Sequence, residues 1–180
     1  METGRVGLAW TVVAAPKPIG ALTVGVTDAG LALVAFGDRP ESARRVAHRL
    51  RLPLDDDPAR TDPARAQLVE YLAGRRRAFT LPLDWRSATE PGRRVLAVLA
   101  ETVPFGATVT YGELAERAGM GGSYTATRAI GSIMGANPFP VVVPCHRVLA
   151  ADGLGGFGGG RAIKEFLLAL EGSLTGTLFE

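Results

Sequence analysis

Residues 141–148 read Val-Val-Val-Pro-Cys-His-Arg-Val, and the predicted fold is built outward from this stretch. Its first three residues are β-branched and predict a short buried strand, which ends just before Cys145 and His146. A thiolate is a strong nucleophile, and a neighbouring imidazole lowers the pKa of a thiol. Because adjacent residues of an extended chain point to opposite sides, we expect a water to bridge the two side chains. An acidic group should orient the imidazole, and Glu171 on the last predicted helix is the leading candidate.

Two short helices are predicted on the N-terminal side of this stretch. Residues 110–113 fit a capping box, with Thr at the N-cap and Glu three residues later, and Gly119 fits the C′ position after that helix. A second helix is predicted over residues 123–136, where Asn137 and Pro138 stop it. Two short helices joined by a glycine-rich turn fit a helix-turn-helix motif, although many helical hairpins share this pattern.

The second of these helices is rich in small residues. Glycine inside a helix costs up to about 1 kcal/mol relative to alanine, so its two internal glycines indicate a neighbour that packs very close. Either another protein element or the backbone of a nucleic acid fits this description. The small residues are Ala126, Ala129, Gly131, Ser132, Gly135 and Ala136, beside the larger Ile130, Ile133 and Met134.

The chain is predicted to be an α/β protein with two domains. Residues 1–85 are expected to form a small α/β domain with a three-stranded antiparallel sheet. Residues 90–180 are expected to form a mainly helical domain that carries the cysteine and a winged helix-turn-helix-like DNA-binding motif. In the first domain the expected strands are 10–15, 22–27 and 31–36, with a further short strand at 81–85. The expected helices are 40–51 and 63–73. The basic run 75–77 fits either a solvated turn or a phosphate contact.

Composition excludes several classes of protein. A single cysteine excludes an internal disulfide framework and a multi-cysteine zinc site, and with only two histidines no metal site is expected. We expect no membrane span, because no apolar run reaches about 18 residues, and no signal peptide, because the first ten residues lack an apolar h-region. A reducing, cytoplasmic compartment fits best. Residues 1–94 carry 15 basic and 11 acidic side chains, residues 95–180 carry 5 and 7, and arginine outnumbers lysine 18 to 2. A pI near 9.0 permits nucleic-acid binding without requiring it.

The run Pro-Cys-His-Arg-Val at 144–148 resembles the active-site signature of the O6-alkylguanine-DNA alkyltransferases, also called methylated-DNA–protein-cysteine methyltransferases. The resemblance is strong over residues 91–172, and over residues 10–90 it holds only in outline. The further matching segments are 103–106, 110–115, 128–131, 137–138, 155–160, 164–168 and 171–172, with Ile19-Gly20 and Gly30-Leu31 in the first half.

The resemblance implies direct-reversal DNA repair. Cys145 would take the alkyl group from guanine O6 in one irreversible transfer, so that each molecule acts once. His146 would act through a water, with Glu171 behind it, and Asn137 would brace the turn beside the cysteine. Neither a metal nor another cofactor is expected, and the protein is expected to be a monomer.

The resemblance also implies how DNA is bound. The O6 atom of guanine is buried in a duplex, so the base must be flipped out, and Arg128 would fill the space that it leaves. The slim helix would lie in the minor groove of double-stranded DNA. Tyr111 would stand near the target phosphate and base, and the backbone around Val148 and Gly158 would hydrogen-bond the guanine edge. The residues assigned to DNA or base contact are Tyr111, Arg128, Ala129, Met134, Gly135, Val148, Phe157 and Gly158.

The chain departs from the family pattern at several positions, which leaves alternatives open. Phe157 stands where the family has tyrosine, and Pro91 and Leu96 replace aromatic residues. The turn 119–125 is longer than usual, and Arg147 fits a buried ion pair as well as a direct role. The alternatives are a cysteine hydrolase, a lesion-binding protein without transfer, and a paralogue with an altered substrate. The presence of the cysteine argues against a lesion-binding protein without transfer.

Overall fold

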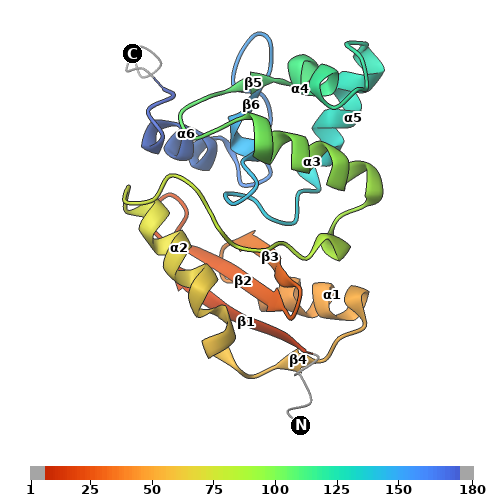
Figure 1. Cartoon of the computed structure of the whole chain (residues 1–180). Helices are drawn as coiled ribbons and strands as arrows, with labels where there is room; N and C mark the ends of the chain where they lie inside the picture. Colours follow the sequence, from red (N-terminus) through yellow and green to blue (C-terminus); the bar gives the residue numbers. More distant parts are fainter. Residues whose placement is uncertain (1–6, 175–180) are drawn as a thin grey trace. The chain divides into compact units, whose positions relative to one another are not determined.

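The computed structural model describes residues 7–174 and divides between Ser87 and Ala88 into two compact units (Figure 1). The first unit is built on a β-sheet, and the second is mainly helical. This is the mixed α/β fold class that the sequence predicts. None of the helices within residues 7–174 is both long and apolar enough to cross a membrane.

A four-stranded sheet forms the centre of the first unit. β1 (Leu8–Ala14), β2 (Ala21–Thr27) and β3 (Gly30–Phe36) pair antiparallel, as predicted, and β4 (Leu54–Asp55) adds to β1 in parallel. The order of the strands is β3-β2-β1-β4. The prediction of three strands was therefore wrong by one strand, because a strand of two residues is too short to show the alternation that reveals longer ones.

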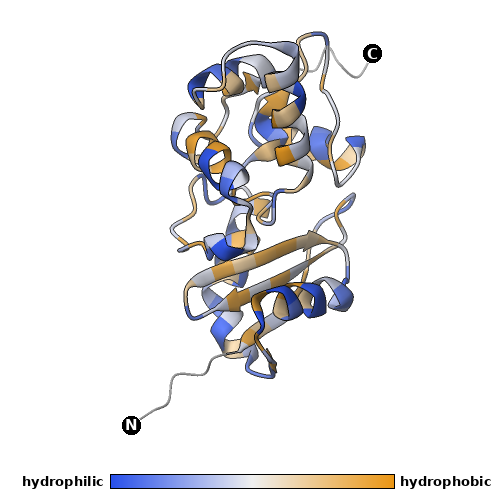
Figure 2. Cartoon of the chain, turned by 90° about the vertical axis from the view of Figure 1, so that its right-hand side faces the viewer, coloured by the Kyte–Doolittle hydropathy of each residue, from blue (hydrophilic) through white to orange (hydrophobic). Residues whose placement is uncertain are grey.

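Two helices complete the first unit, close to their predicted positions. They are α1 (Pro40–Leu50) and α2 (Asp62–Leu72), and each has a proline in its first turn, where no N–H needs a partner inside the helix. Figure 2 shows the strands of this unit coloured largely as hydrophobic. One face of α1 packs on the sheet in a cluster of Leu8, Ala32, Leu33, Ala43, Val46 and Ala47.

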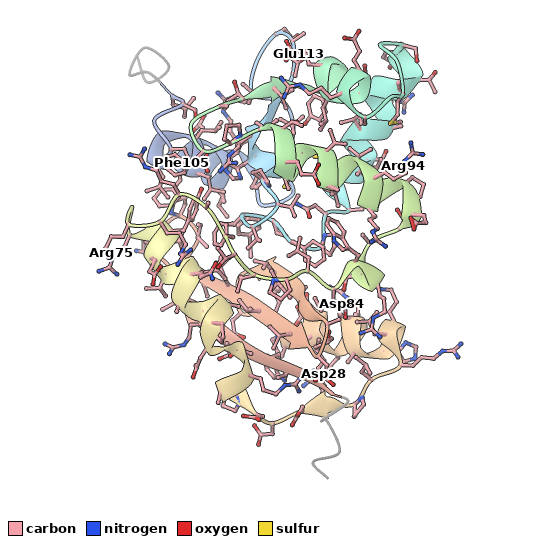
Figure 3. The ribbon with its side chains drawn as sticks, in the orientation of Figure 1. Asp28, Arg75, Asp84, Arg94, Phe105 and Glu113 are labelled. Carbon is pink, nitrogen blue, oxygen red and sulfur yellow. The ribbon has the colours of Figure 1, made fainter. Side chains whose placement is uncertain are left out.

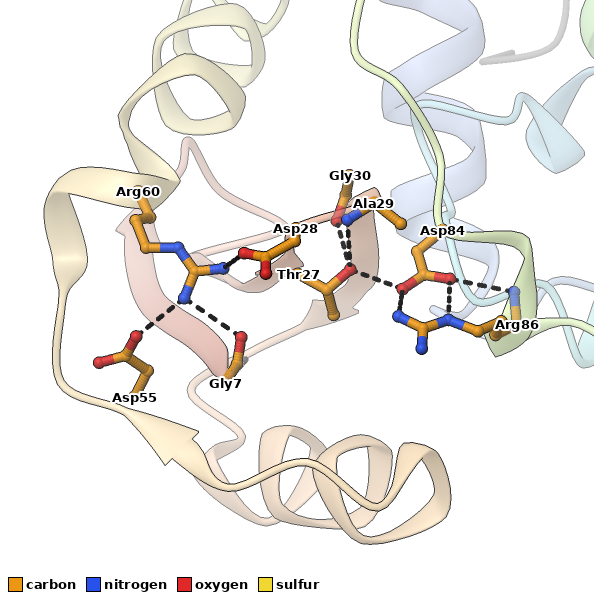
Figure 4. A network of polar contacts seen from close by, with 9 residues as sticks. All are labelled: Gly7, Thr27, Asp28, Ala29, Gly30, Asp55, Arg60, Asp84 and Arg86. Atoms are coloured by element: carbon orange, nitrogen blue, oxygen red, sulfur yellow. Dashed lines mark hydrogen bonds and ion pairs between the residues drawn. The ribbon is translucent and has the colours of Figure 1, made fainter. Parts of the chain in front are cut away.

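Arg60 holds the short strand β4 at the edge of the sheet. Its Nη1 donates hydrogen bonds to Oδ2 of Asp55 at 2.8 Å and to the carbonyl oxygen of Gly7 at 3.1 Å. Its Nη2 donates to Oδ1 of Asp28 at 3.0 Å (Figure 4). One guanidinium therefore joins the two ends of the β1–β4 pairing to the turn between β2 and β3.

Residues 81–85 do not form the predicted strand. Leu83 makes one isolated bridge with Leu31, and two backbone hydrogen bonds flank it. The N–H of Leu31 donates to the oxygen of Pro82 at 2.8 Å, and the N–H of Asp84 donates to the oxygen of Leu31 at 2.7 Å. Proline has no N–H with which to continue a ladder, so the pairing stops after this one point.

Asp84 ties the end of the first unit to β2. Its carboxylate is buried and accepts hydrogen bonds from the hydroxyl of Thr27 and from Nε and Nη2 of Arg86, at 2.9 and 2.6 Å for the last two (Figure 4). Burial raises the pKa of Asp84, but the hydrogen bonds from Arg86 and Thr27 outweigh it and hold that pKa below its ordinary value. The carboxylate is therefore charged and fully engaged at neutral pH.

Within residues 88–174 the second unit combines four α-helices with a pair of short parallel strands. Thr89 caps the first helix by accepting a hydrogen bond from the N–H of Gly92 at 3.2 Å. Buried leucines and valines of that helix and of the later ones form the core. The elements are α3 (Glu90–Thr102), β5 (Val109–Thr110), α4 (Tyr111–Arg117), α5 (Tyr124–Gly135), β6 (Val148–Leu149) and α6 (Arg161–Leu170).

The predicted helix-turn-helix is present as α4 and α5. The capping box at the start of α4, where Figure 3 labels Glu113, is complete: Thr110 accepts from the N–H of Glu113 at 3.1 Å, and the Glu113 carboxylate accepts from the N–H of Thr110 at 2.8 Å. Gly119 has φ +76°, the left-handed conformation expected after a helix end. Ser123 caps α5 by accepting from the N–H of Ala126 at 3.1 Å.

Candidate active site

Cys145 begins a single 3-10 turn, Cys145–Arg147, that leads into β6. Its side chain is 5% exposed and lies in the wall of a cavity of about 470 Å³. The valines before it form turns rather than the predicted strand, and Val141 has φ +75°, which is rare for a β-branched residue. The premise of an extended chain at the cysteine was therefore wrong.

Asn137 explains why the valines do not pair as a strand. Its Oδ1 accepts a hydrogen bond from the N–H of Phe139 at 2.9 Å, and its Nδ2 donates to the carbonyl oxygen of Val143 at 3.0 Å. The N–H of Val143 in turn donates to the oxygen of Phe139 at 2.8 Å. These bonds fold the segment after α5 into a closed loop and fix the backbone just before Cys145.

His146 is completely buried against Glu171. Its Nε2 lies 2.9 Å from Oε1 of Glu171, so Nε2 carries the hydrogen of the neutral ring, since a carboxylate only accepts. Its Nδ1 has no hydrogen-bond partner among residues 7–174. The lone pair of Nδ1 is therefore buried in the turn that carries the cysteine and can accept a hydrogen bond.

Arg147 makes the buried ion pair that the sequence allowed. Its Nε and Nη2 each donate to the Glu171 carboxylate at 2.8 Å, and its Nη1 donates to the carbonyl oxygen of Val103 at 2.7 Å. Because a guanidinium already balances Glu171, the carboxylate has less negative charge to offer the imidazole of His146.

The environment keeps both reactive groups neutral at rest. Burial raises the pKa of the Cys145 thiol, and the amide of Asn137 and the ammonium of Lys164 only partly oppose it. Burial lowers the pKa of His146 more than the hydrogen bond to Glu171 raises it. A neutral imidazole can accept a proton and the thiol can give one up, so the pair is suited to forming a thiolate when an electrophile arrives.

Sequence reasoning missed Lys164 as a member of the site. It is 1% exposed, and its Nζ donates to the carbonyl oxygens of Val148 at 2.7 Å and Gly156 at 3.2 Å. Burial lowers its pKa to about 8. The available signal was its rarity, because it is one of two lysines in an arginine-rich chain and lies among apolar residues of α6.

The cavity brings together most of the residues predicted to contact DNA or base. Tyr111 donates to the carbonyl oxygen of Gly156 at 3.3 Å, and burial, with a smaller effect of Cys145, raises the pKa of this phenol. Ala129 and Val148 do not line the cavity, and His146 and Glu171 lie behind its wall. Besides Cys145, the predicted residues that line it are Tyr111, Arg128, Met134, Gly135, Phe157 and Gly158.

Two family models cover most of the chain. One is described as 6-O-methylguanine DNA methyltransferase, DNA binding domain, and matches residues 90–173; the other, its ribonuclease-like domain, matches residues 13–85. A methylated-DNA–protein-cysteine methyltransferase of Mycolicibacterium paratuberculosis is 41% identical over 156 residues, which cover 86% of this chain and 88% of the relative. The chain belongs to the methylated-DNA–protein-cysteine methyltransferase family.

Other members of the family match this chain in sequence and in structure along nearly its whole length. The inducible methyltransferase of Bacillus subtilis is 32% identical over 175 residues, 95% of this chain and 94% of its own. A solved structure of Mycobacterium tuberculosis OGT in complex with DNA superimposes with a TM-score of 0.75 at 36% identity, covering 92% of this chain and 93% of that one. The resemblance drawn from the cysteine motif is thereby confirmed.

Proposed function

We propose that this protein repairs O6-alkylguanine in double-stranded DNA by moving the alkyl group onto Cys145. The observation that carries the proposal is the position of the thiol: it lies in the wall of a cavity of about 470 Å³, with the buried base His146 next in the chain. The related Mycobacterium tuberculosis protein has been solved in complex with DNA, which supports DNA as the partner here.

The transfer needs a proton to leave the thiol. Nδ1 of His146 is the acceptor, through a water, and the resulting imidazolium keeps its Nε2–H bond to Glu171. The Cys145 sulfur then forms a bond to the alkyl carbon as the bond between that carbon and guanine O6 breaks. The electron pair stays on the guanine, which takes up the proton that left the thiol, so that His146 is neutral again and charge balances over the whole step. The thioether product is not readily hydrolysed, and the protein is used once.

The slim face of α5 fits the minor groove. Gly131 and Gly135 have nothing within 4 Å of where a Cβ would lie, so the face is open for a nucleic-acid backbone to approach. A base flipped into the cavity leaves a gap in the stack, and an inserted side chain offsets part of the unstacking energy. Arg128 is the charged side chain of α5 that lines the cavity, and we assign it to that gap.

The flipped guanine is held by groups around the thiol. Tyr111 lines the cavity and is placed near the base, while its hydroxyl donates to the carbonyl oxygen of Gly156. The backbone of Gly158, which lines the cavity, is assigned to the guanine edge, whereas Val148, predicted to share this role, does not line the cavity. Phe157 supplies an apolar ring at the cavity without a hydroxyl, so that the contact it makes with the base is one of packing.

Intact-protein mass spectrometry tests the function directly. After incubation with a duplex that carries O6-methylguanine, the protein should gain the mass of one methyl group on Cys145, and repair should stop at one equivalent. Cys145→Ser should abolish transfer and retain DNA binding, because the shape of the site is nearly unchanged. Turnover beyond one equivalent contradicts the proposal, and lesion binding without any mass gain indicates a lesion-binding protein instead. Light scattering tests the further expectation of a monomer.

A further inference from the structure

Tyr124, the first residue of α5, is unusually exposed for an aromatic side chain. Its exposed fraction is 77%, whereas the other exposed large hydrophobic side chains among residues 7–174 lie between 36% and 43%. Aromatic rings bury a large apolar area when they are covered. An exposed ring at the start of the proposed DNA-binding helix is therefore unfavourable in water unless it has a binding or positioning role.

The ring of Tyr124 faces the guanidinium of Arg128. Cζ of Arg128 lies 5.8 Å from the centroid of the ring, within the range of a cation–π contact. The two residues are four apart, so they are neighbours on one face of the helix. Arg128 makes no ion pair within the described part of the chain, which leaves the ring as its main support.

The backbone that carries this pair is firmly held. Ser123 caps the helix, and its carbonyl oxygen accepts the hydroxyl of Thr127 at 3.1 Å in addition to the N–H of that residue at 3.0 Å. The ring therefore projects from a fixed first turn. In the same conformation that touches the ring, Arg128 lines the cavity that contains Cys145.

We propose that Tyr124 is a positioning residue for Arg128: the ring holds the guanidinium at the mouth of the cavity before the helix docks on DNA. The inference rests on the proposed function, in which Arg128 fills the gap left by the flipped base. A free arginine side chain loses considerable rotamer freedom when it is fixed. A ring that restricts it beforehand reduces that loss at the moment of flipping, so the step speeds up without any change at the thiol.

The test compares two substrates. Methyl transfer from a duplex requires base flipping, whereas reaction with the free base O6-benzylguanine does not. Tyr124→Ala should slow the duplex reaction about two- to fivefold, the range expected for losing an exposed cation–π contact, and leave the free-base reaction unchanged. Tyr124→Phe keeps the ring and should behave as wild type, and Tyr124→Leu, which keeps bulk without a π face, should resemble Tyr124→Ala.

A double-mutant cycle shows whether the ring acts through Arg128. Arg128→Ala should slow the duplex reaction, and Tyr124→Ala should have no further effect in that background. Met120→Ala is the matched control, since Met120 is 39% exposed on the preceding turn, and it should leave both rates unchanged. An additive double mutant, equal losses on both substrates, or an unchanged duplex rate in Tyr124→Ala would each overturn the proposal. Failure of the wild type to react with either substrate would instead contradict the proposed function.

Discussion

Arg147 and Glu171 form a two-pronged buried ion pair, with Nε 2.8 Å from Oε2 and Nη2 2.8 Å from Oε1. The same Oε1 accepts the Nε2–H of His146 at 2.9 Å. One carboxylate thus connects the base of the proposed reaction to a fixed positive charge, and that charge adds to burial in lowering the pKa of His146.

Arg147→Met should strongly destabilise the protein. It removes the partner of a buried carboxylate, and breaking one side of such a pair lowers the free energy of unfolding by about 3–5 kcal/mol. Urea unfolding followed by helical circular dichroism measures the effect. Arg161→Met is the matched control, because Arg161 pairs with Glu165 on the surface of α6 and should change stability by at most about 0.5 kcal/mol. Equal effects of the two variants would contradict this account.

Stability should fall as the pH drops below about 6.5, and transfer should fall at a lower pH, where the buried ring of the folded protein becomes protonated. The pKa of His146 in the folded protein lies below its ordinary value of 6.5 because the ring is buried. The unfolded chain therefore binds the proton first as the pH falls, which favours unfolding. The imidazolium also no longer accepts the proton of the thiol. The free energy of unfolding and the transfer rate of the wild type should be measured from about pH 7 to 5.

His146→Gln should flatten that dependence, whereas His48→Gln, on the exposed side of α1, should leave it intact. A slope that persists in His146→Gln would assign the effect to another group.

Lys164→Met should move the pH profile of transfer to higher pH. The ammonium of Lys164 lowers the pKa of the Cys145 thiol, and each unit by which that pKa rises reduces the thiolate fraction about tenfold. We therefore expect transfer to slow by up to about tenfold at neutral pH. The reaction with O6-benzylguanine measures this without DNA. Since the pKa of Lys164 is about 8, wild type and variant should converge above that pH, and parallel profiles would refute the electrostatic role.

Asp84→Asn should destabilise the first unit by about 1–3 kcal/mol at neutral pH, because hydrogen bonds to a buried carboxylate are lost. The pKa of Asp84 lies below its ordinary value of 3.8 when folded. Its stabilising contribution is therefore complete above about pH 4 and is lost as the pH falls through the folded pKa. The variant should show a smaller loss of stability in acid than the wild type.

Tryptophan fluorescence isolates this unit, since Trp10 and Trp85 are the only two tryptophans and both belong to it. Asp62→Asn, which removes an exposed pair with Arg65, is the control. If Asp62→Asn destabilises the first unit as much as Asp84→Asn does, the hydrogen bonds of the buried Asp84 carboxylate are not the cause of the lost stability.

Local signals in the sequence predicted the helices and their ends well. The capping box at Thr110 and the N-cap at Ser123 are set by hydrogen bonds within four residues, so a short window contains all the necessary information. The contact between His146 and Glu171 was anticipated from chemistry, because a buried imidazole needs an acidic or polar partner.

Two features that the sequence did not predict depend on hydrogen bonds that composition does not reveal. Val141–Val143 has the composition of a strand, but the side chain of Asn137 and the backbone of Phe139 bind the loop closed. The two residues of β4 gain their place from Arg60 and from pairing with β1. The strand β4 depends on a tertiary pairing, whereas the valines are held by residues four and six positions away, and in both cases these contacts override the preference of the composition.

The ammonium of Lys164 fits between two carbonyl oxygens, at 2.7 and 3.2 Å. Elsewhere this chain uses arginine far more often than lysine, 18 residues to 2 in total. A guanidinium is planar, wider, and charged at any physiological pH, so it has neither the size nor the adjustable charge for this position. At position 164, therefore, lysine and arginine are not interchangeable, in a chain that otherwise relies on arginine.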